Sequence, residues 1–271
     1  MKKILAILLT VAFVAGLAGV ALAEEAYDAV MKKGTLVVGV RDGVPGFGYV
    51  DPQTREIVGY DVDFAKYFAN KLGVKLEMKP VVPATRIPSL TEGNMDIIVA
   101  TMTYTPERAK QVDFSYTYFA TVQKLLVKKG TVKSLKDLDG KKIGTSKGST
   151  SEQNAKKALP NSTILSFDDY GPAVLALEQG KVAAVTTDLS ILEQLHEKMP
   201  NKKRYEIPDI KISEEPYGIG VRKDSPKMLK FVNETLLEME KNGEAGKIFE
   251  KWFGPNSPKP QKRTFKIVAD R

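Results

Sequence analysis

Short apolar runs alternate with amphipathic stretches along most of the chain. Residues 35–40 form a buried-strand pattern, whereas residues 60–72 place apolar side chains at helical spacing and end before Gly73. Further strands are predicted at 74–78, 96–101, 122–127, 142–145, near 164 and at 182–186, and further helices at 87–92, after Thr105, from 149, and at 172–179, 189–198, 226–241 and 245–253. This alternation predicts an α/β protein with mostly parallel sheets, and its two successive sets predict two lobes.

The first 23 residues predict a cleaved secretory signal peptide. Lys2 and Lys3 precede an apolar run over residues 4–20, and Ala21-Leu22-Ala23 supplies the small residues of a cleavage site. An uncleaved anchor is the alternative, which the Ala-x-Ala end of the run disfavours. The chain has no Cys for a lipoprotein tether and no second apolar run long enough to span a bilayer. The mature protein is therefore expected to be soluble and periplasmic.

Composition and charge narrow the classes of partner. The formal charge of +8 falls to +6 once Lys2 and Lys3 leave with the signal peptide. The remaining lysines are scattered in pairs and have no accompanying RNA-binding aromatic signature, so we expect a solvated basic surface and no nucleic-acid partner. The absence of Cys excludes disulfides and thiolate zinc sites, and no other metal-ligand spacing or cofactor motif is found.

The segment from Thr101 to Arg108 is the first candidate for ligand chemistry. Thr101 and Thr103 follow a predicted buried strand, where open α/β sheets collect ligands. Arg108 lies near a helix start, where a cation opposes the helix dipole, so a functional role is one interpretation: its planar guanidinium suits a carboxylate. The alternative is a surface Arg paired with Glu107 or Asp113.

Two other segments place polar groups at predicted helix starts. Ser149 and Glu152 predict a capping box, which gathers N–H groups and hydroxyls around Thr150. Asp188 ends an apolar strand, where it could hold an ammonium group or cap the next helix. Taken singly, a capping role is the simpler interpretation of both segments.

Together, these segments resemble the polar amino-acid-binding proteins of ABC uptake systems, solute-binding protein family 3. The matching stretches are residues 59–64, 101–108, 112–115, 138–144, 217–221 and 251–253, which span essentially the whole mature chain. The resemblance implies a type II periplasmic-binding fold, with lobe 1 formed by residues 24–119 and 217–271, lobe 2 by residues 120–216, and a two-strand hinge. It implies capture of a small amino acid by hinge closure, delivery to membrane permease subunits and a monomeric state.

The resemblance also assigns roles to individual residues. Arg108, aided by Thr103 and the Thr150 region, would bind the ligand α-carboxylate, and Asp188 would bind the α-ammonium. Phe47 would lie against the ligand. Thr101 and Ser149 complete the expected contacts around these groups.

The side-chain preference implied is acidic. In the glutamate/aspartate-binding branch of the family, basic residues at the positions of Arg41 and Arg86 hold the side-chain carboxylate, and Tyr170 falls where that branch carries a hydrogen-bonding His or Tyr. Burying a second carboxylate requires a paired cation, and three arginines against Asp188 alone satisfy that need. Surface arginines without a ligand, and a different polar amino acid, are the alternatives.

An enzyme is the rival class. Some relatives on this scaffold are cyclohexadienyl dehydratases, whose chemistry needs a positioned general acid. The sequence offers only His196, on a predicted solvated helix face, and no second acid with a clear role beside Asp188. We therefore expect a binding protein without catalytic residues.

Overall fold

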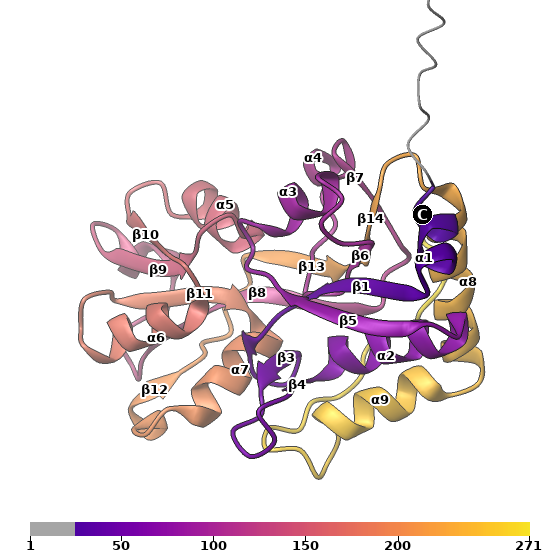
Figure 1. Ribbon diagram of the computed structural model, residues 1–271. Coiled ribbons are helices and arrows are strands. Elements are labelled where there is room, and N and C mark those ends of the chain that lie inside the picture. Colours follow the sequence, from indigo (N-terminus) through magenta and orange to yellow (C-terminus); the bar gives the residue numbers. More distant parts are fainter. Residues whose placement is uncertain (1–24) are drawn as a thin grey trace, which may run out of the picture.

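The computed structural model describes residues 25–271, which form two lobes lying side by side (Figure 1). The predicted signal peptide lies outside the described residues. The helices are α1 (Ala26–Lys33), α2 (Tyr60–Leu72), α3 (Arg86–Thr91), α4 (Pro106–Ala109), α5 (Thr150–Ala158), α6 (Tyr170–Glu178), α7 (Leu189–Lys198), α8 (Pro226–Lys241) and α9 (Glu244–Phe253). The strands are β1 (Thr35–Val40), β2 (Gly43–Val44), β3 (Gly48–Val50), β4 (Ile57–Val58), β5 (Lys75–Pro80), β6 (Ile97–Ile98), β7 (Val112–Phe114), β8 (Phe119–Lys128), β9 (Lys142–Ser146), β10 (Thr163–Phe167), β11 (Ala184–Asp188), β12 (Tyr205–Glu206), β13 (Ser213–Tyr217) and β14 (Gly220–Arg222).

Lobe 1 is built on a sheet with the order β5-β1-β6-β14-β7. Strand β1 runs parallel to β5 and β6, whereas β14 runs antiparallel to β6 and β7. Helix α2 packs on β1 and β5 because its apolar positions recur on one face, which buries Val62, Ala65 and Phe68. Arg41, directly after β1, contacts Asp169 of the second lobe, so the carboxyl end of β1 lies where the two lobes meet.

Lobe 2 has the sheet order β10-β9-β11-β8-β12. Strands β10, β9 and β11 are parallel, and β8 runs antiparallel to β11. Strand β13 pairs with β8 from Ser213↔Gln123 to Tyr217↔Phe119, which places the two chain crossings beside each other. The two-lobed α/β fold predicted from the sequence is confirmed. The main sheet of each lobe is mixed and not mostly parallel, because β14 and β8 run antiparallel to their neighbours. The predicted residue boundaries of the lobes stay a prediction.

Most element bounds follow the sequence pattern, with two informative exceptions. The strand predicted at residues 96–101 is reduced to Ile97–Ile98, and Thr101, its predicted last residue, has a positive φ of 48°, outside the extended region. Helix α6 begins at Tyr170, two residues before the predicted start, because the Asp169 side chain accepts a hydrogen bond from the Tyr170 N–H and caps it.

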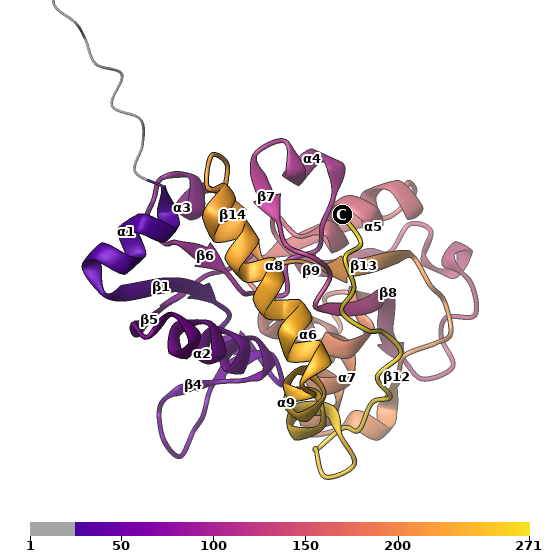
Figure 2. The same cartoon turned by 90° about the vertical axis from the view of Figure 1, so that its right-hand side faces the viewer.

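The C-terminal segment after α9 runs back along both lobes, as Figure 2 shows in yellow. The Lys259 carbonyl accepts a hydrogen bond from Gln194 of lobe 2, at 3.4 Å. Farther on, Phe265 packs against Phe119 with ring centroids 5.0 Å apart, and Arg271 Nε donates to the Ser115 carbonyl at 2.6 Å. Within residues 25–271, no helix is long and apolar enough to cross a membrane.

Candidate ligand-binding site

Helix α4 positions Arg108 in the cleft between the lobes. Thr105 caps the helix by accepting a hydrogen bond from the Arg108 N–H at 3.2 Å, and Pro106 occupies the first turn, as predicted. The guanidinium is buried; Nη1 donates to the Thr103 carbonyl at 2.9 Å and Nη2 to the Gly148 carbonyl of lobe 2 at 3.3 Å. Arg108 thus reaches from one lobe to the other.

The alternative of a surface ion pair for Arg108 is excluded. Asp113 is paired with Lys223 at 2.8 Å, and Glu107 is exposed to solvent. A buried guanidinium that donates only to carbonyl oxygens has no neutralising partner among its hydrogen bonds. It is therefore available to an anionic ligand group.

Asp188 occupies the N-cap position of α7, yet its side chain makes no capping hydrogen bond. The carboxylate instead accepts a hydrogen bond from the Tyr217 phenol, and Ser151 Oγ lies 3.4 Å from its other oxygen. Burial and the negative charge of Glu215 raise the pKa of Asp188 to about 8. A cation placed here would stabilise the ionised carboxylate, which is the environment that an ammonium group needs.

Glu215 is a central residue that sequence reasoning missed. It lies in β13 and is buried; its Oε2 accepts hydrogen bonds from Thr103 Oγ1 of lobe 1 at 2.6 Å and from Thr150 Oγ1 of lobe 2 at 2.8 Å. Asn154 donates to its other oxygen at 3.0 Å. The alternation of β13, in which residues 215 and 217 are buried and residue 214 is exposed, is the signal that could have revealed it.

Arg86 and Arg41 join Arg108 in one buried cluster of positive charge. Arg86 Nη1 donates to the Ala100 carbonyl and, at 2.9 Å, to the Thr101 carbonyl. Burial, together with the charges of Arg108 and Arg41, lowers the pKa of Arg86 to about 9. The surface-arginine alternative is therefore wrong for Arg86 and Arg41, both of which are buried.

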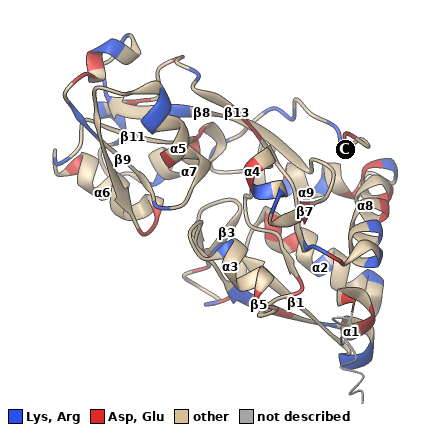
Figure 3. Cartoon of the chain, turned by 90° about the horizontal axis from the view of Figure 1, so that it is seen from above, with Lys and Arg blue, Asp and Glu red and all other residues tan. Residues whose placement is uncertain are grey.

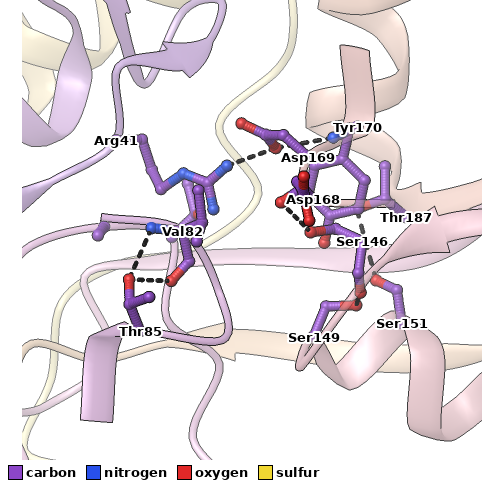
Figure 4. A network of polar contacts seen from close by, with 12 residues as sticks. Arg41, Val82, Thr85, Ser146, Ser149, Ser151, Asp168, Asp169, Tyr170 and Thr187 are labelled. Carbon is purple, nitrogen blue, oxygen red and sulfur yellow. Dashed lines mark hydrogen bonds and ion pairs between the residues drawn. The ribbon is translucent and has the colours of Figure 1, made fainter. Parts of the chain in front are cut away.

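Arg41 makes an ion pair across the cleft with Asp169 of lobe 2, Nη2 to Oδ1 at 2.5 Å (Figure 4). The Arg41 side chain is fully buried, and its Nε and Nη1 have no hydrogen-bond partner. Asp169 also caps helix α6 by accepting from the Tyr170 N–H at 2.7 Å. Burying two nitrogen donors without acceptors costs folding free energy. A ligand oxygen at this place would accept their hydrogen bonds and remove that cost.

The capping hydrogen bonds at the start of helix α5 differ from the capping box predicted for Ser149 and Glu152. Ser149 Oγ accepts from the Glu152 N–H at 3.0 Å, as a cap should, and donates to the Ser146 carbonyl at 2.6 Å. Glu152 accepts from the Gly148 N–H at 2.7 Å and not from Ser149, so the expected capping box is displaced by one residue. The Ser149 hydroxyl is thus engaged within its own turn, whereas Thr150 meets Glu215 in the cleft.

Phe47 and Tyr170 are both buried. Phe47 is buried in an aromatic cluster with Phe119 and Phe253, at centroid distances of 4.9 and 5.0 Å. Burial and the charge of Asp188 raise the pKa of Tyr170, which places its phenol near that carboxylate. A direct contact of either residue with a ligand stays a prediction.

Asp61 fixes the backbone of Thr101 through a buried hydrogen bond. Its Oδ2 accepts the Thr101 N–H at 2.9 Å, and the Tyr118 phenol donates to its Oδ1 at 2.7 Å. A β-branched residue at positive φ is strained, so this hydrogen bond holds a conformation that Thr101 would not adopt alone. Burial raises the pKa of Asp61 to about 7.

The rest of the surface carries mixed charge. Lys and Arg are spread over both lobes and interspersed with acidic residues (Figure 3). Among residues 25–271, no group of His, Cys, Asp and Glu side chains is arranged to hold a metal ion.

Comparison with known proteins identifies the family. Residues 36–255 match the family model described as bacterial extracellular solute-binding proteins, family 3. The chain belongs to this family. It is 39% identical over 235 residues to the ABC transporter glutamine-binding protein GlnH of Bacillus subtilis strain 168, covering 85% of each chain, and 33% identical over 270 residues to the glutamate/aspartate import solute-binding protein of Escherichia coli K12, covering 92% of this chain and 89% of that one.

Solved structures agree with the family assignment. An ancestral arginine-binding protein bound to glutamine is 45% identical, with a TM-score of 0.77, covering 82% of this chain and 98% of that one. An ancestral amino-acid-binding protein described as a precursor of cyclohexadienyl dehydratase is 37% identical, also with a TM-score of 0.77, covering 83% of this chain and 98% of that one.

Proposed function

We propose that this protein is the periplasmic substrate-binding component of an ABC uptake system and that it captures L-glutamine. The relatives named above are amino-acid-binding proteins by name, and the cleft offers a guanidinium and a carboxylate for the two charged groups of an amino acid. The observation that carries the proposal is the pair of unpartnered donors on buried Arg41, beside the carboxylate of Asp169.

Arg108 and Asp188 are suited to the zwitterion that every free amino acid shares. Arg108 would bind the α-carboxylate and Asp188 the α-ammonium, because each is buried and each electrostatically influences the other. The hydroxyls of Thr103 in lobe 1 and Thr150 in lobe 2 both donate hydrogen bonds to Glu215. Closure of the lobes would bring these two residues together around the α-carboxylate and α-ammonium groups of the ligand. Closure about the ligand would be a hinge motion of the β8–β13 crossings.

The side-chain end of the site selects for an oxygen acceptor. Arg41 Nε and Nη1 would be satisfied by a carbonyl or carboxylate oxygen but not by a lysine or arginine side chain, which carries donors only. An amide also donates, and Asp169 can accept that hydrogen bond. Glutamine therefore matches both members of the Arg41–Asp169 pair.

The acidic ligand expected from the sequence is the second candidate, and the charge balance weighs against it. The expectation set three arginines against Asp188 alone. In the described part of the chain, Asp61, Asp169 and Glu215 also interact with these arginines. A second ligand carboxylate would enter a site whose positive charge is already offset.

Ligand-dependent melting of residues 24–271 tests the proposal, using glutamine, glutamate, aspartate, asparagine, arginine and lysine. Glutamine should raise the melting temperature most; a shift with the basic amino acids alone would refute the proposal. Arg108→Ala should abolish the shift for every amino acid, since breaking a buried charge pair costs about 2–5 kcal/mol. Lys110→Ala removes an exposed cation two residues later and should leave the shift unchanged.

A separate activity assay addresses the dehydratase alternative. Glu215 provides the second acid near Asp188 that the sequence did not reveal. The raised pKa of Asp188 itself is what a general acid requires. Incubation with prephenate should give no loss of substrate if the protein is a binding protein only. Steady loss that disappears in Asp188→Asn would establish the enzyme.

A further inference from the structure

We infer that Asp169 is the residue that makes this site discriminate against acidic amino acids. The inference rests on the proposed function, since it concerns the side-chain end of the same site. Asp169 holds Arg41, the cation that would otherwise bind a ligand side-chain carboxylate.

The ion pair is formed between lobes and in an enclosed setting. Arg41 follows β1 in lobe 1 and is fully buried, whereas Asp169 precedes α6 in lobe 2 and has 19% of its side chain exposed. The carboxylate also packs closely on the opposite lobe: a Cβ added at Gly43 would lie 2.8 Å from Asp169 Oδ2. The bulk and charge of Asp169 are therefore part of the closed cleft wall.

Two fixed contacts orient the Asp169 carboxylate. Its Oδ1 accepts the hydrogen bond from the Tyr170 N–H at 2.7 Å and also receives Arg41 Nη2 at 2.5 Å. Because the helix cap holds the side chain at the start of α6, the carboxylate cannot swing away without uncapping the helix. A glutamate side chain reaching Arg41 would therefore meet a second carboxylate that stays in place.

The consequence differs between an amide and an acid. An amide oxygen can accept from Arg41 Nε or Nη1 while its NH₂ donates to Asp169, so the pair recognises both ends of the amide. A carboxylate gains the same Arg41 contacts but opposes the charge of Asp169, which is mostly shielded from solvent. Asp169 thus favours glutamine in two ways: it accepts a hydrogen bond from the glutamine amide, and its negative charge repels the glutamate side-chain carboxylate.

Asp169→Asn tests this role with little change in shape. The asparagine oxygen retains the helix cap, and the negative charge is lost. By calorimetric titration at fixed pH, glutamate affinity should rise at least about tenfold relative to glutamine affinity, the scale expected for one close buried charge. Asp168→Asn is the matched control, because it removes an exposed carboxylate from the same loop and should leave the ratio of affinities unchanged.

The single variant Arg41→Gln and the double variant Arg41→Gln/Asp169→Asn complete a double-mutant cycle. If Asp169 acts through Arg41, the gain for glutamate should vanish when both charges are removed. An unchanged ratio in Asp169→Asn, an equal change in Asp168→Asn, or a wild-type protein that already prefers glutamate would overturn the inference. Failure of the wild-type protein to bind any amino acid would instead overturn the proposed function.

Discussion

The phenol of Tyr217 donates a hydrogen bond to the carboxylate of Asp188, so the end of strand β13 is tied to the start of helix α7. This contact turns Asp188 away from capping its helix. Because β13 is one of the two strands in which the chain crosses between the lobes, the residue proposed to hold the ligand ammonium is oriented by a crossing strand. The predictions for Tyr217 and for the protonation of Asp188 depend on this contact.

Tyr217→Phe should weaken amino-acid binding about 5- to 20-fold, since a hydrogen bond to a charged group contributes about 1.5–3 kcal/mol in proteins, part of which other contacts would recover. The ring and its packing against Phe119 would remain. The hydrogen bond also lowers the pKa of Asp188, so its loss disfavours the ionised form. Tyr116→Phe, which alters a half-buried phenol elsewhere, should leave binding unchanged; equal losses in the two variants would contradict this role.

Binding should release a proton near neutral pH. The pKa of Asp188 is raised to about 8 by burial and by Glu215, so at pH 7 most of the ligand-free protein carries a proton there. An ammonium ligand favours the ionised form, and affinity should therefore rise between pH 6 and pH 8.

Titration calorimetry in buffers of different ionisation enthalpy measures that proton directly. Nearly one proton should be released per ligand at pH 7, and fewer in Glu215→Gln, because removing the neighbouring negative charge lowers the pKa of Asp188. A value of zero in the wild-type protein would mean that Asp188 is already ionised before binding.

Asp61 should make the ligand-free protein less stable as pH rises. Its pKa is about 7 in the fold against 3.8 in the unfolded chain, so the stability it contributes is complete below pH 4 and is lost as pH rises through 7. Thermal melting should therefore show a drop between pH 5 and pH 8 that is smaller in Asp61→Asn. An identical drop in the variant would show that other groups control this pH dependence.

Gly59→Ala should prevent folding or destabilise the protein by more than about 3 kcal/mol, since neighbouring backbone atoms would have to move. Gly59 has a φ of 149°, and a Cβ there would lie 2.0 Å from the Phe47 carbonyl oxygen. Gly73→Ala is the control, because its φ of 69° is also unfavourable but its Cβ would meet nothing within 4 Å. Gly73→Ala should cost only about 1–2 kcal/mol, as read from chemical denaturation.

Local pattern was enough to predict most of the helices and longer strands, but not α1 or the sheet of β2, β3 and β4. The bounds of α2, α7 and α8 follow directly from apolar spacing and from Gly73. Arg108 and Asp188 are buried, and their roles toward a ligand stay predictions. Both residues lie beside a strand end or a helix start, where short-range signals are strong.

The contributions of Glu215 and Asp169 to the site could not be predicted from local sequence in the same way. Glu215 depends on the pairing of β13 with β8, and Asp169 acts on a residue 128 positions away in the chain. The alternation of β13 can mark residue 215 as buried, but no local pattern shows which distant charged groups these two carboxylates face. For this reason the acidic preference inferred from Arg41 and Arg86 counted the cations but missed the carboxylates that offset them.

Calorimetric titration of residues 24–271 with L-glutamine and two derivatives tests the central claim most directly. One derivative has its α-amino group acetylated, and the other has its α-carboxylate converted to an amide. The account predicts saturable binding of glutamine and, because each derivative removes a charge that Asp188 or Arg108 requires, a loss of at least about 30-fold for both. Binding of either derivative as tightly as glutamine, or no binding of glutamine at all, would contradict it.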